Sequence, residues 1–373
     1  MIAVGIAALS LLIWVGLLGS GFWRADINDA RARKAEPSIW PTVVAIVPAR
    51  DEADVIARSI GSLAAQDYPG SFSILLVDDN SSDGTAEMAR KLGSDRLTIL
   101  PGAPLAQGWT GKLWAVSQGV AAAGTPDYMW LTDADIEHAP DTLRALVGIA
   151  QAGERRLVSF MARLRCDTPA ERALIPAFVF FFQMLYPFAW VNRPRGIGAA
   201  AGGCVLVRRD ALEAAGGIAA IRAALIDDCT LGSLIKRQGP IWLGLTNRSR
   251  SIRPYDGAGP IAAMISRSAY AQLDYSPLKL IGTIIGLALV YFAPPVLALF
   301  ATGWARSLGA AAWLLMAASF QPMLRFYRRS PLWGLALPGI AAFYAGCTIL
   351  SAWQHGRGRG GMWKGRAQAA VGR

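Results

Sequence analysis

The chain has 373 residues, of which 53% are hydrophobic and 17% are charged. So large an apolar share excludes an ordinary water-soluble enzyme and indicates membrane segments. The net charge of +11 comes from the C-terminal part, because no Asp or Glu follows Asp274 while residues 275–373 carry ten Lys or Arg. This distribution indicates membrane topology and contact with anionic lipids, and it argues against nucleic acid as a partner.

The N-terminal stretch predicts a membrane anchor. Residues 1–23 are apolar and uncharged over about one bilayer thickness, and they lack the positive start of a cleaved signal peptide. Residues 24–40 form a basic linker with Arg24, Arg31, Arg33 and Lys34. The positive-inside rule therefore predicts that the following domain lies in the cytoplasm.

Residues 41–275 alternate short apolar runs with helical patterns, which predicts an α/β domain with a mostly parallel sheet of the nucleotide-binding type. The expected strands are 42–47, 73–77, 97–100, 127–132, 156–161, 204–207 and 241–245. The expected helices include 52–65, 85–92, 113–123 and 140–151.

An aromatic-rich stretch at 173–191 interrupts this alternation. Its density of Phe, its Pro187 and its basic flanks favour a helix at the membrane interface, with a buried core helix as the alternative. Residues 276–354 then hold three apolar stretches, and residues 355–373 form a basic tail. Three crossings place this tail outside, against the positive-inside rule, so either one stretch is re-entrant or the tail is tolerated there.

The segment Trp130–Asp135 ends an apolar strand in two carboxylates, Asp133 and Asp135. Open α/β sheets bind ligands at this edge, and oxygen donors beside a diphosphate suit Mg²⁺ or Mn²⁺. The alternatives are a solvated strand end or Asp133 as a helix N-cap.

Two other strand ends also carry polar groups. Arg50 and Glu52 follow the first strand, and Asp78 and Asp79 follow the second. These groups are positioned to reach a base or a ribose. The alternatives are a helix start capped by Asp51 and an Asx turn after the second strand.

Two further segments offer charge and proton transfer. Within Gly108–Ala115, small residues surround Lys112, a point charge suited to a diphosphate, although the spacing is not that of a P-loop. Asp227 and Asp228 offer a carboxylate that can take a proton from an acceptor hydroxyl. A solvated lysine and a helix cap are the respective alternatives.

In this order, the motifs resemble those of family 2 inverting glycosyltransferases with the GT-A fold, from about Pro41 to Tyr275. Gly108–Ala115, Asp227–Leu231 and the one-plus-three membrane layout are most similar to the hopene-associated membrane glycosyltransferases. The resemblance implies a UDP-sugar donor, Mg²⁺ or Mn²⁺, and a lipid acceptor such as a hopanoid. It also implies a multi-pass protein of the bacterial cytoplasmic membrane.

The resemblance also implies roles for single residues. The residues that it implies contact the base or ribose are Pro48, Arg50, Glu52, Asp78 and Asp79. It implies that Lys112 contacts the diphosphate. Asp133 and Asp135 match the Asp-x-Asp of the family, with Asp135 preferred as the direct metal ligand. Asp228 matches the general base, and Asp227 replaces the Glu before it.

One family motif is almost absent. Where processive synthases carry Gln-x-x-Arg-Trp, the stretch Met264–Tyr270 keeps only Arg267, which argues against a processive synthase and leaves Arg267 as a diphosphate contact. Two alternatives remain: a glycosyltransferase for another polyprenoid or carotenoid lipid, and a non-catalytic membrane protein that binds nucleotide sugars.

Overall fold

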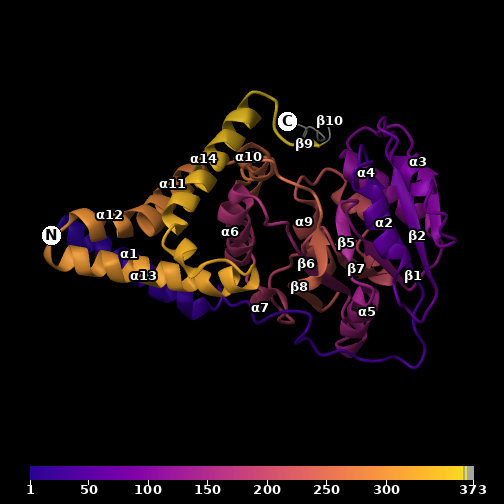
Figure 1. The fold of residues 1–373 in the computed structure, drawn as a ribbon, viewed down its shortest axis with the longest axis horizontal. Coiled ribbons are helices and arrows are strands. Elements are labelled where there is room, and N and C mark those ends of the chain that lie inside the picture. The colour runs from indigo at the N-terminus through magenta and orange to yellow at the C-terminus, as the bar shows by residue number, and fades with distance from the viewer. Residues whose placement is uncertain (364–365, 368–373) are drawn as a thin grey trace. The chain divides into compact units, whose positions relative to one another are not determined.

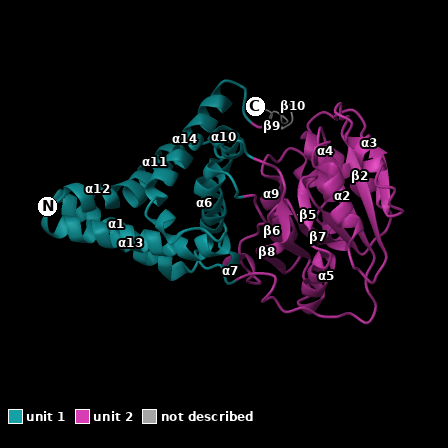
Figure 2. Cartoon of the chain, viewed as in Figure 1, with its two compact units in different colours: residues 1–26, 166–189, 255–360 teal, residues 27–165, 190–254, 361–373 magenta. Residues whose placement is uncertain are grey.

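The computed structural model describes residues 1–363 and 366–367, so the predicted basic tail lies partly outside the described residues. The chain, whose helices and strands are labelled in Figure 1, divides into two compact units (Figure 2). Unit 1 comprises residues 1–26, 166–189 and 255–360, and unit 2 comprises residues 27–165, 190–254 and 361–373. The predicted domain of 41–275 therefore differs from unit 2, because 166–189 and 255–275 belong to unit 1.

Unit 2 is built on an eight-stranded sheet with the order β3-β2-β1-β4-β7-β6-β8-β5. Strands β3, β2, β1 and β4 run parallel, and so do β6 and β8, whereas β7 is antiparallel to both its neighbours and β5 is antiparallel to β8. The strand bounds are β1 Val43–Ala49, β2 Phe72–Asp78, β3 Leu97–Pro101, β4 Tyr128–Leu131, β5 Ile136–His138, β6 Leu157–Arg163, β7 Val205–Arg208 and β8 Ile241–Ser251. A two-stranded ribbon, β9 Met362–Trp363 with β10 Arg366–Ala367, is separate from this sheet.

Helices follow most strands of the sheet. They are α2 Ile56–Ala64, α3 Thr85–Arg90, α4 Gly111–Ala122, α5 Thr142–Ala152, α8 Arg209–Ala214, the 3-10 helix η1 Ile218–Ile221 and α9 Asp227–Lys236. All seven residues of β1 and all four of β4 are buried, which explains why both strands read as continuous apolar runs.

The predicted strands of this region are confirmed with two differences, and the predicted helices are confirmed except that α2 begins at Ile56, four residues after the predicted start at Glu52. Strand β5 was not predicted, since a three-residue strand is too short for an apolar pattern. Strand β8 extends to Ser251, six residues beyond the predicted end at Leu245. The extension pairs with β5, and this pairing makes polar residues such as Arg250 part of a strand.

Unit 1 is helical. Its elements are α1 Ile2–Ser20, α6 Pro169–Leu185, the start of α7 Phe188–Val191, α10 Ala258–Ser266, the 3-10 turn η2 Ala271–Leu273, α11 Pro277–Leu287, the π-helical η3 Ala288–Phe292, α12 Ala293–Phe300, α13 Gly303–Phe326, the 3-10 turn η4 Pro331–Gly334 and α14 Leu337–Gly356. Aromatic contacts join these helices. Trp14 packs edge-on against Tyr291 and donates its indole N–H to the carbonyl of Val290 at 2.9 Å.

The aromatic stretch forms α6 and α7, which are separated by Tyr186 and Pro187; Pro187 has no backbone N–H with which to continue the hydrogen bonds of α6. A capping box between Thr168 and Glu171 starts α6. Phe180 is fully buried and packs against Phe320 of α13, while Phe181 packs against Tyr344 of α14. Within unit 1, this side of α6 is therefore core, as in the alternative above. Its placement at a membrane interface stays a prediction.

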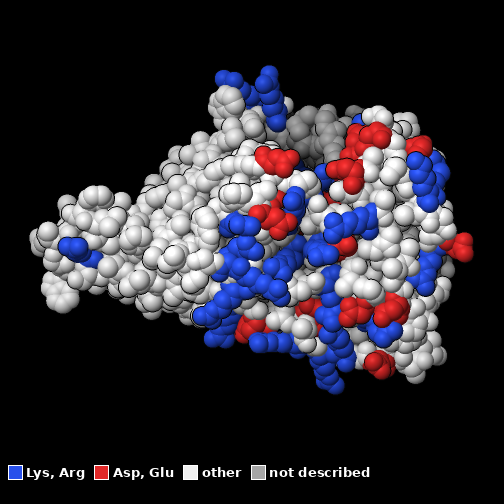
Figure 3. All heavy atoms as spheres, in the orientation of Figure 1, with Lys and Arg blue, Asp and Glu red and all other residues white. Residues whose placement is uncertain are grey.

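Three helical stretches among the described residues are long and apolar enough to cross a membrane: Ile2–Ser20, Pro277–Phe300 and Gly303–Phe326. Large apolar side chains on them, such as Leu12, Ile285 and Leu299, are exposed, as expected of surfaces that face lipid. The face seen in Figure 3 is almost uncharged over α1, α12 and α13. Helix α14 corresponds to the last of the three apolar stretches predicted after residue 276. It is not one of the three helical stretches able to cross a membrane, and its last turn contains the polar residues Gln354 and His355.

Candidate active site

The site lies where strand β4 ends. Asp133 and Asp135 occupy the loop between β4 and β5, at the edge where the neighbouring parallel strand β1 also ends. No helix begins at Asp133 in this described loop, so the N-cap alternative is wrong for that residue. A pocket opens beside it, lined by Pro48, Lys112, Leu113, Val116, Leu131, Thr132, Asp133, Gly202, Val205, Ile218, Ile221, Asp227, Asp228 and Leu231.

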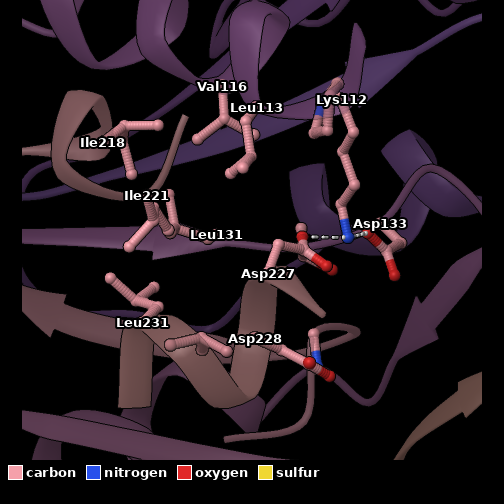
Figure 4. Close-up of a pocket in the computed structure, with 14 residues that line it drawn as sticks. Lys112, Leu113, Val116, Leu131, Asp133, Ile218, Ile221, Asp227, Asp228 and Leu231 are labelled. Atoms are coloured by element: carbon pink, nitrogen blue, oxygen red, sulfur yellow. Dashed lines mark hydrogen bonds and ion pairs between the residues drawn. The ribbon is translucent and has the colours of Figure 1, made fainter. Parts of the chain in front are cut away.

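Lys112 joins two carboxylates in this pocket (Figure 4). Its Nζ lies 2.8 Å from Asp133 Oδ1 and 3.0 Å from Asp227 Oδ2. Burial opposes the charged form of Lys112, but the two carboxylates outweigh it and raise the pKa of Lys112 above its usual range. Burial likewise raises the pKa of Asp133, and Lys112 opposes that shift. Lys112 is thus an ion-paired cation, and the solvated alternative is wrong.

Asp227 and Asp228 occupy the first turn of α9, where the helix dipole favours negative charge. The Asp228 carboxylate accepts hydrogen bonds from the backbone N–H of Gly202 at 3.0 Å and from that of Cys229 at 2.7 Å. Burial, followed by repulsion from Asp227, raises the pKa of Asp228 to about 6. Two backbone donors therefore hold a carboxylate whose proton affinity is unusually high.

The position of α9 depends on close packing against the segment before Gly202. A Cβ at Gly232 of α9 would lie 2.3 Å from the carbonyl carbon of Ala199, far inside contact distance. A Cβ at Gly198 would likewise lie 2.3 Å from the Cα of Ser233 in the same helix, so only the hydrogen of glycine fits there. Glycine at these places lets α9 present its first-turn carboxylates beside Gly202.

We expect Gly232→Ala to lower the free energy of unfolding by about 1–3 kcal/mol, because overpacking outweighs the gain in helix propensity. Gly61→Ala in α2 is the matched control, since nothing lies within 4 Å of its added Cβ; it should be neutral or slightly stabilising. Thermal unfolding of both variants in detergent checks this. Equal effects of the two would show that α9 does not need the close contact.

Arg253, which the sequence analysis did not single out, also belongs to the site. Its Nη2 lies 2.6 Å from both carboxylate oxygens of Glu52, and its Nε donates to Asp135 Oδ2 at 2.8 Å. The residues from Asn247 to Ser251 alternate long polar and small side chains, and this period of two was the one signal that the strand continues beyond Leu245. A longer β8 would have placed Arg253 at the strand end.

A buried polar network supports the Asp133 loop. Thr132 donates its hydroxyl proton to the Gly203 carbonyl at 2.8 Å and lies 2.9 Å from His138 Nε2; Ser249 Oγ lies 2.9 Å from His138 Nδ1. Because the Thr132 proton is used, His138 must donate through Nε2 and accept at Nδ1. Burial lowers the pKa of His138 to about 3, so the ring is neutral.

Hydrogen bonds connect the loop after β1 with the loop after β2. Arg50 donates to the Asp79 carbonyl at 2.6 Å, and Asp51 accepts from the backbone N–H of Ser82 at 2.8 Å. Helix α2 begins at Ile56 with Val55 as N-cap, so the idea that Asp51 caps it is wrong. Asp83 accepts from the backbone N–H of Thr85, two residues on, at 3.0 Å, which is the Asx turn of the alternative, while Asp78 accepts from that of Ser81 at 3.2 Å.

The other residues that were predicted to contact the nucleotide are placed by the structure, but their contacts with it are untested. Pro48 lines the pocket, Glu52 is buried with Arg253, and the Asp79 side chain is fully buried. Arg267 follows α10 in unit 1. The contacts of these residues with a base, ribose or diphosphate stay predictions.

The donor set of Asp133 and Asp135 fits a divalent cation. Mg²⁺ and Mn²⁺ prefer carboxylate oxygens and are commonly held by one or two carboxylates together with substrate phosphates. In the described residues no group of three or more His, Cys, Asp or Glu is placed to hold a metal. Both carboxylates already face a side-chain cation, Lys112 or Arg253.

The comparisons with known proteins agree on the fold. Residues 44–216 match a family model described as Glycosyl transferase family 2. Two curated relatives named beta-monoglucosyldiacylglycerol synthase, from Trichormus variabilis and a Nostoc species, are each 29% identical over 230 residues, covering 57% of this chain and 47% of the relative. The chain thus spans about half the length of these relatives.

Among solved structures, the mannosyltransferase PcManGT from Pyrobaculum calidifontis, determined with GDP-Man and Mn²⁺, is similar with a TM-score of 0.55. The identity is 19%, and the likeness covers 94% of this chain and 99% of that one, so it shows a shared fold. The matched residues 44–216 include the elements that carry Lys112, Asp133 and Asp135, so this region is a glycosyl transferase family 2 domain with the GT-A fold.

Proposed function

We propose that this protein is a membrane-bound inverting glycosyltransferase that moves a sugar from a UDP-sugar to a hydroxyl of a lipid. The observation that carries the proposal is the grouping of Asp133, Lys112, Asp227 and Asp228 around one pocket, with an apolar wall beside Asp228. The charged side suits a diphosphate and the apolar side suits a lipid-like acceptor.

Asp228 is the general base in this proposal. Its two backbone hydrogen bonds fix the carboxylate, and a raised pKa makes it a better proton acceptor while leaving it ionised near pH 7. The acceptor hydroxyl gives its proton to Asp228 as its oxygen bonds to the anomeric carbon, and the bond from that carbon to the diphosphate breaks on the opposite face. One displacement inverts the centre.

Lys112 lies beside both Asp133 and Asp227, where it supplies positive charge near the leaving diphosphate. When bound, Mg²⁺ or Mn²⁺ would supply further charge neutralisation of the departing UDP, and Asp133 and Asp135 would hold it. Arg253 and the Thr132–His138 network hold the two carboxylates in place.

The lipid acceptor is supported by two features. Leu113, Val116, Ile218, Ile221 and Leu231 are buried and line the pocket beside Asp228. Three helical stretches among the described residues are able to span a membrane, which would keep the enzyme at its lipid substrate. We place the protein in a bacterial cytoplasmic membrane with unit 2 on the cytoplasmic side, from the basic residues that follow α1.

The proposal is tested by release of UDP from a panel of UDP-sugars by detergent-solubilised protein with Mn²⁺ or Mg²⁺. GDP-mannose serves as the second donor class, and a hopanoid alcohol, a carotenoid alcohol and diacylglycerol are compared as acceptors. Lipid-dependent release with an inverted glycoside as the product supports the proposal. Nucleotide binding without turnover on any acceptor would instead support a non-catalytic nucleotide-sugar-binding protein.

The raised pKa of Asp228 predicts an acid limb in the pH profile. Because the base must be ionised, kcat/KM should fall as the pH decreases through about 6 and reach half its plateau near that value. The profile is measured at saturating metal, with the thermal unfolding temperature recorded at each pH to exclude loss of structure. An acid limb centred near pH 4, the usual range of an aspartate, would contradict this assignment.

A further inference from the structure

Arg253 is the side chain that joins the loops after β1 and β4. Its guanidinium contacts both oxygens of Glu52 in one loop and one oxygen of Asp135 in the other. The backbone reinforces the link, because the N–H of Ile252 donates to the Asp135 carbonyl at 2.9 Å. Neither the resemblance nor the similarities reported above assign a role to this arginine.

The contact is well protected from water. The side chain of Glu52 is 7% exposed, that of Asp135 is 16% exposed and that of Arg253 is 30% exposed. Glu52 is fixed from its backbone side too, since its N–H donates to Thr85 Oγ1 at 2.8 Å. Although burial works against it, the two carboxylates raise the pKa of Arg253 above its usual range, so the residue stays a cation.

This geometry matters for Asp135. Its Oδ2 is engaged by Arg253, and a full positive charge lies at hydrogen-bond distance from the carboxylate that the proposed function uses as a metal ligand. A second cation placed beside the same carboxylate is repelled by the first. A nucleotide diphosphate, by contrast, brings negative charge that offsets this repulsion, and its phosphates supply oxygen ligands of their own.

We propose that Arg253 is a positioning residue that occupies the cation place beside Asp135 in the nucleotide-free protein and thereby makes tight metal binding depend on the donor diphosphate. The inference rests on the proposed function in one respect, the role of Asp135 as a metal ligand. By linkage, the arginine strengthens the coupling between metal and nucleotide while it weakens the binding of metal alone.

The test is Mn²⁺ binding to the full-length protein in detergent, followed by the electron paramagnetic resonance signal of free Mn²⁺, without and with UDP. In the wild type, UDP should tighten Mn²⁺ binding at least tenfold. In Arg253→Gln, Mn²⁺ alone should bind about tenfold more tightly than in the wild type, and the effect of UDP should shrink. Arg253→Lys keeps the charge but loses the planar fork that contacts Glu52 and Asp135 together, so its affinity for Mn²⁺ alone should lie between those of the wild type and Arg253→Gln.

Arg58→Gln is the matched control, because Arg58 makes a similar two-bond contact with Glu137 at 2.8 and 2.9 Å and should not change Mn²⁺ binding. Unchanged or weaker binding of Mn²⁺ alone by a folded Arg253→Gln overturns the inference and makes Arg253 a structural cross-link. Should that variant not fold, equal affinities of the wild type for Mn²⁺ with and without UDP still overturn the inference. Failure of the metal site itself is distinguishable, because Asp135→Ala would then leave UDP-dependent Mn²⁺ binding intact.

Discussion

Replacing Asp228 with Asn should lower kcat by about 10²–10⁴-fold, the range that general-base catalysis contributes, while UDP binding stays unchanged. The change removes the proton acceptor and keeps the size of the side chain. UDP binding is expected to survive because the pocket cation Lys112 pairs with Asp133 and Asp227 and not with Asp228. Turnover is measured as UDP release with the lipid acceptor, and UDP affinity by calorimetry.

The substitution has a structural cost that must be separated from the chemical one. Both oxygens of Asp228 accept backbone N–H groups, and an amide nitrogen cannot accept, so Asn loses one of the two hydrogen bonds. Thermal unfolding of the variant therefore accompanies the kinetics. Asp210→Asn is the matched control, since Asp210 pairs with Arg208 at the exposed start of α8 and should keep full activity.

The neighbouring carboxylate provides the outcome that would contradict the assignment. Asp227 also lies in the first turn of α9, but it pairs with Lys112. Should Asp228→Asn retain near-normal turnover while Asp227→Asn loses it, the general base is Asp227, and the pH profile must be reinterpreted.

The strand ends of this site were predictable because each follows an uninterrupted apolar run. Strand β4 is buried at all four positions, so its end, and with it Asp133 and Asp135, is visible in the sequence. Arg253 was not predictable in the same way, because it follows a strand extension whose residues alternate polar and small, and because its partners lie 201 and 118 positions away. Only tertiary pairing with β5 makes this extension a strand.

The division into units was harder still to predict. Residues 166–189 lie between strands β6 and β7 in the chain, yet they belong to the helical unit with 1–26 and 255–360. Local patterning identified an apolar aromatic helix there, and it correctly placed the break at Pro187. Its partners, such as Phe320 and Tyr344, lie more than a hundred residues further along the chain, and no periodicity within the segment specifies them.

Lys112→Met is expected to weaken donor binding by about 10–100-fold, since a hydrogen bond to a charged group contributes about 1.5–3 kcal/mol. The variant loses the cation between Asp133 and Asp227, and the two carboxylates then repel a diphosphate as well as each other. Solvent reaches these side chains, of which 22–34% is exposed, so we expect a loss of unfolding free energy of only about 1–3 kcal/mol.

UDP affinity by calorimetry, at two salt concentrations, checks this. Lys112→Arg keeps the charge and should retain most of the affinity, whereas Lys236→Met removes a lysine of α9 whose Nζ contacts the carbonyls of Val191 and Arg193 and should leave UDP binding unchanged. Wild-type UDP affinity in Lys112→Met would mean that the lysine only holds α9 against the Asp133 loop. The contact with the diphosphate would then have to come from another cation, such as Arg253, which contacts Asp135.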